Sequence, residues 1–209
     1  MAIKSESLVD LFKAGAKVKV WVAPYGEAVP ADSVGIGTAW GGNWESLGWT
    51  EAGVKLIHAQ SKAQAKIQQA TMAVTSAITE ETLRGETVLS LSDPSRVAVI
   101  LGRASTAATD TAAGAGQVGK TELTLAATVT RGQKWALGVE SNQFDANGAE
   151  LPRRIFFPRV ELMPNGDLMT FDTQSDAFSG LPVAWDAFAD VANSMNYMTY
   201  QNVTAPAAS

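Results

Sequence analysis

The feature that most constrains the fold is the stretch of residues 153–188, in which alternating runs are separated by two turn signals. Before the dipeptide Asn165-Gly166, apolar residues alternate with charged ones, and a second mixed run follows over residues 168–173. Asn-Gly between two such runs is typical of a tight β-hairpin turn, because both residues tolerate a positive φ angle. A third run begins after Gly180 with the sequence Leu-Pro-Val. The stretch therefore predicts a hairpin followed by a further strand.

Alternation with a period of two residues also predicts a strand near the start of the chain. Val18, Val20 and Val22 share one face of this segment, and Trp21 lies on the other with two lysines. The segment that follows, residues 24–50, is irregular and rich in glycine, and it contains three tryptophans: Trp40, Trp44 and Trp49. A long loop with that much aromatic area buries it, either against its own sheet or against a partner.

Residues 54–91 predict a long, modestly polar arm. Strand-like runs occupy residues 55–60 and 71–91, and the intervening residues 61–69 are rich in Ala, Gln and Lys. That composition has helical propensity, yet in a hairpin arm it can equally extend. We favour a strand, a loop and a second strand.

Two further strand predictions come from the second half of the chain. Residues 121–130 alternate and lead through Arg131-Gly132 into another alternating run, residues 135–139, which predicts a hairpin. An edge strand is expected near residues 197–200, before the chain end frays.

Two short helices are predicted. Residues 5–14 carry Leu8, Leu11 and Phe12 at helical spacing before a glycine stop. Residues 93–102 place Pro94 at the first helical position and end at Gly102, with apolar residues around most of the circumference. We expect the second helix to be buried against a sheet. The Ala/Gly/Thr-rich residues 104–119 have nothing to bury and are expected to form a flexible loop.

The predicted fold is mainly β, a sandwich or barrel with long hairpins and one packed short α-helix. Residues 1–16 form an N-terminal arm with a short helix, residues 17–190 the β domain with its loops at 24–50 and 104–119, and residues 191–209 an edge strand and tail. An apolar content of 46% in 209 residues is enough for one core.

Composition excludes several classes of function. The chain has no cysteine and a single histidine, so disulfides, thiolate metal sites and histidine-dependent triads are not expected, and neither is a cofactor. A net charge of −5 does not suit phosphate binding, which uses clustered Lys and Arg. The longest uninterrupted apolar run, residues 97–101, is too short to span a bilayer, and the first residues lack the apolar segment of a secretion signal.

One nucleotide-binding motif is present but is interpreted as a chance match. Residues 114–121 read GAGQVGKT, which fits the phosphate-binding loop pattern. That loop needs a buried strand before it and a helix after it. Here a polar stretch precedes the motif, and an alternating, strand-like run follows it.

Other polar residues are given structural interpretations. Asp167, Asp172 and Asp176 are expected at solvated strand ends, and His58 is expected as a polar residue on a strand face. The residues of DANG, 145–148, indicate a plain turn, since no ladder of calcium ligands follows. The cluster of Arg153, Arg154 and Arg159 suggests a solvated strand end or ion pairs between subunits.

The order of these parts resembles the major tail tube proteins of long, non-contractile-tailed bacteriophages. The resemblance covers residues 17–190 and rests on the segments WESLGWTEAGV, GETVLSLSDPSRVAVILG, RRIFFPRVEL, NGDLMTFDT and GLPVAW, taken in that order. The Ala/Gly/Thr-rich residues 104–119 depart from the family's pattern, which puts the role of that loop in doubt.

The resemblance implies a structural virion protein, not an enzyme, that self-assembles into stacked hexameric rings. The rings would form a tube through which DNA is ejected, made in the bacterial cytoplasm and ending in the virion. Implied partners are other copies of the chain, the tape-measure protein, and the tail terminator and baseplate proteins. Double-stranded DNA would pass without specific binding, and no membrane insertion is expected.

Two sets of residues follow from this resemblance. Faces of small hydroxyl and methyl groups without cations suit a wet lumen that does not hold DNA. The candidates for the lumen are Thr71, Ala73, Thr75, Ala77, Thr79, Thr124, Ala126, Thr128 and Thr130. The candidates for contacts between rings are Leu8, Phe12, Trp40 and Trp44. The alternative functions are a β-rich virion decoration protein, a carbohydrate-binding module that uses the tryptophan loop, and a nucleotide-binding protein that uses residues 114–121.

Overall fold

A computed structural model gives the fold of the chain. It describes residues 18–31, 33–65, 75–90, 94–103, 108–116, 118–125, 133–144, 148–166, 180–191 and 196–203, and for residues 52, 64, 65, 75 and 76 it describes the backbone only. The described part is mainly β with one short helix, as the sequence predicts.

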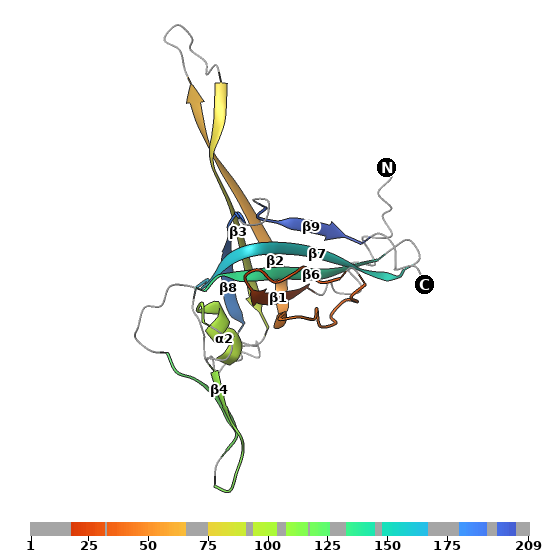
Figure 1. Ribbon diagram of the computed structural model, residues 1–209, viewed down its shortest axis with the longest axis vertical. Helices are drawn as coiled ribbons and strands as arrows, with labels where there is room; N and C mark the ends of the chain where they lie inside the picture. Colours follow the sequence, from red (N-terminus) through yellow and green to blue (C-terminus); the bar gives the residue numbers. More distant parts are fainter. Residues whose placement is uncertain are drawn as a thin grey trace.

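Antiparallel strands form a sheet that closes on itself (Figure 1). The strands are β1 (Val18–Pro24), β2 (Glu45–Ala65), β3 (Thr75–Leu89), β6 (Trp135–Phe144), β7 (Glu150–Pro164), β8 (Leu181–Ala187) and β9 (Thr199–Asn202). They lie in the order β6-β1-β2-β3-β8-β7-β9, and an additional pairing of β6 with β7 completes a circuit. The circuit forms a small barrel, and β9 adds to β7 beside β8.

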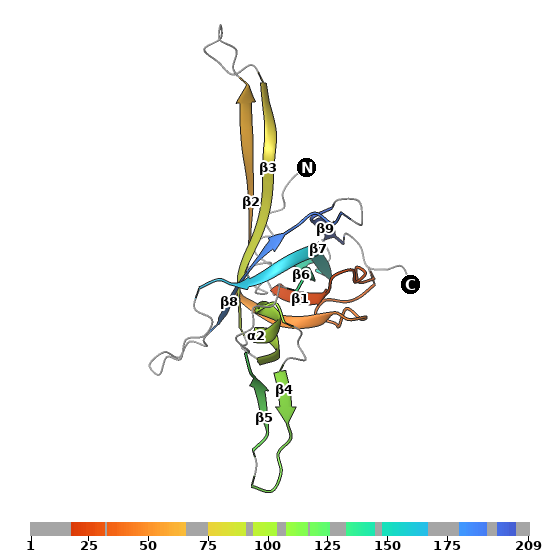
Figure 2. The same ribbon diagram turned by 60° about the vertical axis from the view of Figure 1, so that its left-hand side comes forward.

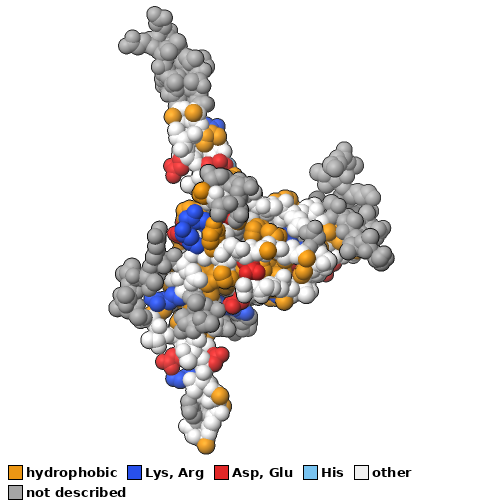
Figure 3. Space-filling view, in the orientation of Figure 1, with side chains coloured by type: hydrophobic (Ala, Val, Ile, Leu, Met, Phe, Trp, Pro, Cys, Tyr) orange, Lys and Arg blue, Asp and Glu red, His pale blue; other side chains and the backbone are white. Residues whose placement is uncertain are grey.

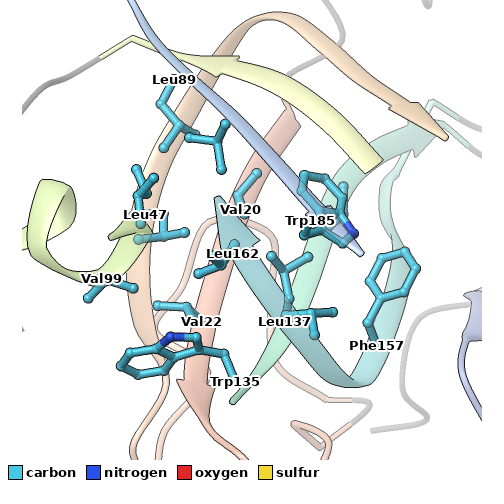
Figure 4. Close-up of a cluster of buried hydrophobic side chains, with 14 of the residues drawn as sticks. Val20, Val22, Leu47, Leu89, Val99, Trp135, Leu137, Phe157, Leu162 and Trp185 are labelled. Atoms are coloured by element: carbon cyan, nitrogen blue, oxygen red, sulfur yellow. The ribbon is translucent and has the colours of Figure 1, made fainter. Parts of the chain in front are cut away.

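The interior of the barrel holds the main hydrophobic core (Figure 4). Alternate residues point inward, so Val20 and Val22 of β1 lie beside Leu137 of the neighbouring strand β6 and share the core with Trp185 of β8. Phe157 and Trp185 pack edge to face, with ring centroids 5.9 Å apart. The alternation predicted for β1 is confirmed.

Helix α2 (Pro94–Ile100) packs its apolar residues into the same core. Val97, Ala98, Val99 and Ile100 are all buried. The helix ends where Gly102 adopts a φ of 70°, a left-handed conformation that costs glycine little, and Arg103 N donates to Ala98 O at 2.9 Å. The predicted buried helix with its glycine stop is confirmed.

A second core lies on the outer face of β1 and β6, under the β1–β2 loop (residues 25–44). Trp21 stacks on Trp40 at 5.3 Å between ring centroids, Trp40 packs against the edge of Trp44 at 5.0 Å, and Trp44 packs against Phe156 at 5.7 Å. The sequence left two places for burying these tryptophans, the chain's own sheet or a partner. Trp40 and Trp44 are buried against the chain's own sheet.

Because the β1–β2 loop packs closely on the sheet, we expect adding one carbon atom at Gly138 to lower the stability of the fold strongly. A Cβ on Gly138 would lie 2.1 Å from Cζ3 of Trp40, so Gly138→Ala must displace a buried indole. We expect a loss of about 1–3 kcal/mol in the free energy of unfolding, which urea titration would measure. Gly114→Ala is the control, because a Cβ there meets nothing within 4 Å. Equal stability of the two variants would contradict this packing.

Two predicted features of residues 104–139 are wrong. Ala108–Thr111 forms β4, which pairs with β5 (Lys120–Leu123) in a separate hairpin, so these residues are not a flexible loop. The predicted hairpin of residues 121–130 with 135–139 does not form over its described part. Its second strand, β6, already has β1 on one edge and β7 on the other, so no edge remains for residues 121–123.

Other strand predictions have different outcomes. Gly166 adopts the positive φ of a turn, 108°, but the run predicted to return after it lies outside the described residues. The end of β7 that leads to the turn pairs with β8. Just beyond this pairing, Asn165 N donates to Pro182 O at 3.1 Å. The predicted edge strand is β9. The helix predicted at residues 5–14 also lies outside the described residues.

Candidate assembly surface

The most prominent feature of the surface is an arm made of the outer parts of β2 and β3. Both strands continue far beyond the barrel as a two-stranded ribbon (Figures 1 and 2). The register keeps them paired from Thr50↔Leu89 at the barrel to Ala65↔Thr75 near the outer end. The two predicted strands are confirmed as far as described, but residues 61–65, predicted to lie in the loop between them, continue strand β2. Residues 66–74 lie outside the described residues.

Both outer edges of the arm lack a strand partner among the described residues. The pairing of β1 with β2 stops at Trp49, and the pairing of β8 with β3 begins only at Leu83. The edge of β3 over residues 75–82 and the edge of β2 beyond residue 50 therefore present backbone N–H and C=O groups to solvent. Such edges are templates for pairing with another chain.

The arm has no core of its own. Every described side chain from Ala59 to Ala63 and from Ala77 to Thr82 is exposed, including Ile78 at 54%. One face pairs Ala59 with Thr82 and Ala63 with Ala77, and the other pairs Gln60 with Glu81 and Lys62 with Ile78. An isolated two-stranded ribbon is marginally stable in water, so the arm needs further contacts to be held rigid.

At its root, a small polar cluster joins the arm to the segment before β9. His58 Nε2 lies 2.5 Å from Glu81 Oε1, and Tyr197 donates its hydroxyl to the same oxygen at 3.0 Å. These hydrogen bonds lower the pKa of Glu81, first through His58 and then through Tyr197, and the bond to Glu81 raises the pKa of Tyr197. His58 is thus a polar residue on a strand face, as predicted.

The lumen candidates separate into four groups. Ala77 and Thr79 lie exposed on the arm, where Thr79 donates to Ser61 O at 3.2 Å. Thr124 is exposed just after β5, in a different sheet from the arm. Thr75 is described only as the first residue of β3. Thr71, Ala73, Ala126, Thr128 and Thr130 lie outside the described residues.

The candidates for contacts between rings are only partly described. Leu8 and Phe12 lie outside the described residues. Trp40 and Trp44 are 5% and 7% exposed, because their indoles fill the cluster beneath the β1–β2 loop. Little of either ring is exposed, so the two do not form the flat exposed platform of a carbohydrate site. Their role in contacts between rings stays a prediction.

The arginine cluster also needs correction. Arg154 is 2% exposed and pairs with the equally buried Glu140, its cross-strand neighbour, through Nη2 and Oε1 at 3.1 Å. Glu140 also accepts from Gly37 N at 3.0 Å and from Trp40 Nε1 at 3.3 Å. Arg154 is therefore neither a solvated strand end nor an ion pair between subunits. The pair ties the β1–β2 loop to the barrel, and no pattern in the sequence marks Glu140 for this role.

Residues 114–121 do not form a phosphate-binding loop in the described part of the motif. Lys120 and Thr121 begin strand β5, where that loop would require a helix. Lys120 Nζ lies 2.5 Å from Glu122, and Thr121 donates to Asp110 at 2.7 Å. Both side chains that would hold phosphate and metal in such a loop are engaged within the hairpin.

The part of the chain that the structure describes contains no cluster of three or more His, Cys, Asp or Glu residues arranged to hold a metal ion. Among those residues, no helix has the length and apolar character needed to cross a membrane. Comparison with models of known protein families found no match, and comparison with curated protein sequences found none either. The arm is therefore assessed on its own geometry.

Proposed function

We propose that this chain is a structural protein whose copies join through their arms into closed rings that stack into a tube. The tube would be the tail tube of a long, non-contractile-tailed bacteriophage, with hexameric rings and DNA passing through the lumen. The observation that carries the proposal is the arm, a long ribbon with two unpaired edges outside a barrel whose own circuit is closed.

Pairing between arms removes the exposed edges without requiring another protein. If the β3 edge of one copy pairs with the β2 edge of the next over residues 75–82, roughly eight backbone hydrogen bonds form. At about 1 kcal/mol each they contribute roughly 8 kcal/mol. Association itself costs roughly 4–15 kcal/mol, so one such contact barely joins two copies. A closed ring, in which every copy uses both edges, satisfies twice as many groups per copy and leaves no free edge.

The side chains of the arm suit a passage for DNA. Its described outer part, beyond Ala59, carries one cation, Lys62, against two anions, Glu80 and Glu81, among small uncharged groups. Figure 3 shows acidic side chains on the described part of the arm. With few cations there is little counterion release on contact with phosphate, hence little affinity for DNA. In this proposal the other partners are the tape-measure, terminator and baseplate proteins, and the site of action is the virion.

The direct test is negative-stain electron microscopy of the purified protein, concentrated over several days. We expect hollow tubes of uniform diameter with a periodic repeat along their length. A protein that remains a monodisperse monomer at millimolar concentration would contradict the proposal. A stable small oligomer that binds a glycan would favour the carbohydrate-binding alternative.

A further inference from the structure

The β4–β5 hairpin projects from the barrel as a separate two-stranded sheet, with no further strand paired to it among the described residues. It extends below helix α2, at the opposite end of the molecule from the arm (Figures 1 and 2). Leu123 at its base packs against the main core, but Val118 near its tip is 78% exposed. A two-stranded hairpin with so little burial is marginally stable in water. The hairpin and its apolar tip therefore call for a surface on another molecule.

The tip is uncharged throughout. Residues 112–119, between the end of β4 and the start of β5, contain alanine, glycine, one glutamine and Val118. Charged side chains occur only on the strands, where Lys120 pairs with Glu122 and Asp110 accepts from Thr121. The complementary surface should thus be an apolar hollow with no unsatisfied charge.

Such a hollow lies between the β1–β2 loop and the strands β7 and β9. Its volume is about 260 Å³, and its walls include Val29, Pro30, Trp40, Phe156 and Tyr200. Val29 and Tyr200 at its rim are 49% and 53% exposed. The charged group in the wall, Arg154, donates to Glu140 and to the backbone carbonyls of Ala31 and Val34. The hollow therefore presents apolar surface to an incoming side chain.

The hairpin points away from the strands that wall the hollow. In both ribbon views β4 and β5 extend below α2, whereas β7 and β9 lie above it. A hairpin at one end cannot reach the hollow of its own chain, but it can reach that of a second copy placed head to tail. A contact between two different surfaces repeats without limit, as a stacked assembly requires.

We propose that the hairpin of one copy inserts Val118 into the apolar hollow of a second copy, joining one ring to the next. The occupant is another copy because the projecting tip and the hollow belong to the same molecule and match in polarity. A second hollow, about 200 Å³ at the root of the arm, is lined partly by Glu81 and Tyr197 and suits an uncharged tip less well. This inference rests on the proposed function, since it assigns the contact between rings.

The absence of native cysteine allows a direct test by disulfide cross-linking. A disulfide requires Cα atoms about 4.4–6.8 Å apart, so it reports close contact. Carrying Val118→Cys and Val29→Cys together, the protein should form a ladder of covalent multimers on mild oxidation, at least tenfold above either single variant. The control combines Val118→Cys with Lys55→Cys, whose side chain is exposed on β2 away from the hollow.

A second variant separates this inference from the proposed function. Val118→Asp places a charge at the tip and should leave rings that no longer stack, whereas Thr109→Asp, on the same hairpin but far from its tip, should still give tubes. Normal tubes from Val118→Asp without cross-linking would overturn the inference and leave the proposed function standing. Cross-linking in a protein that forms neither rings nor tubes would support the contact and overturn the proposed function.

Discussion

Excising the outer part of the arm should give a stable monomer that forms no tubes. In this variant a two-residue Asn-Gly turn replaces residues 61–80 and joins Gln60 to Glu81, which are already directly paired. Asn-Gly closes a hairpin in a type I′ turn, so the inner part of the β2–β3 pair keeps its register. The described side chains removed are all exposed, so the core should be unaffected. We therefore expect a melting temperature within a few degrees of the parent protein.

The loss of assembly should be complete, because the variant retains only residues 81 and 82 of the unpaired β3 edge. Sedimentation velocity would measure the fraction assembled, and electron microscopy would show whether tubes remain. Lys62→Gln is a matched control, since it changes a side chain on the arm without shortening either edge. If the excised variant still formed tubes of the same diameter, arm pairing would not be the contact that closes the ring.

The largest effect on stability is expected from Glu140→Ala. This change removes the acceptor for Arg154, Gly37 N and Trp40 Nε1 and leaves the guanidinium buried without its counter-charge. Breaking a buried ion pair by removing one partner costs about 3–5 kcal/mol. Urea unfolding followed by tryptophan fluorescence would measure the loss.

Two comparisons test the cause of that loss. Glu122→Ala removes one partner of an exposed pair on the β4–β5 hairpin and should leave stability unchanged within error. The double variant Glu140→Met with Arg154→Met should lose less than the sum of the two single changes, because neither charge then remains buried alone. Strictly additive losses would show that the pair contributes only as two independent side chains.

The strands and the helix could be predicted where the sequence pattern is local. Val18, Val20 and Val22 alternate because one face of β1 points into the barrel, and Pro94 and Gly102 mark the ends of α2. The arm was also predictable, because its side chains are exposed and its sequence is accordingly made of small and polar residues.

What failed depends on contacts distant in the chain. Nothing in residues 121–139 reveals that both edges of β6 are taken by β1 and β7, so the nearest alternating run seemed the natural partner. Arg154 was predicted to be solvated because the groups that bury it are distant in the chain. Its partner Glu140 lies on a neighbouring strand, and the β1–β2 loop covers it. The residues that form the β4–β5 hairpin show no amphipathic pattern in the sequence, so the hairpin could not be predicted.

The closed circuit of strands also bears on how copies would be made and stored. Because the barrel completes its own pairings, each chain can fold by a first-order process that is independent of protein concentration. Ring formation is then a later step of higher kinetic order, and it slows steeply as subunits are diluted. Folded subunits can therefore accumulate in dilute solution, and tubes grow once the subunit concentration is high enough for rings to close.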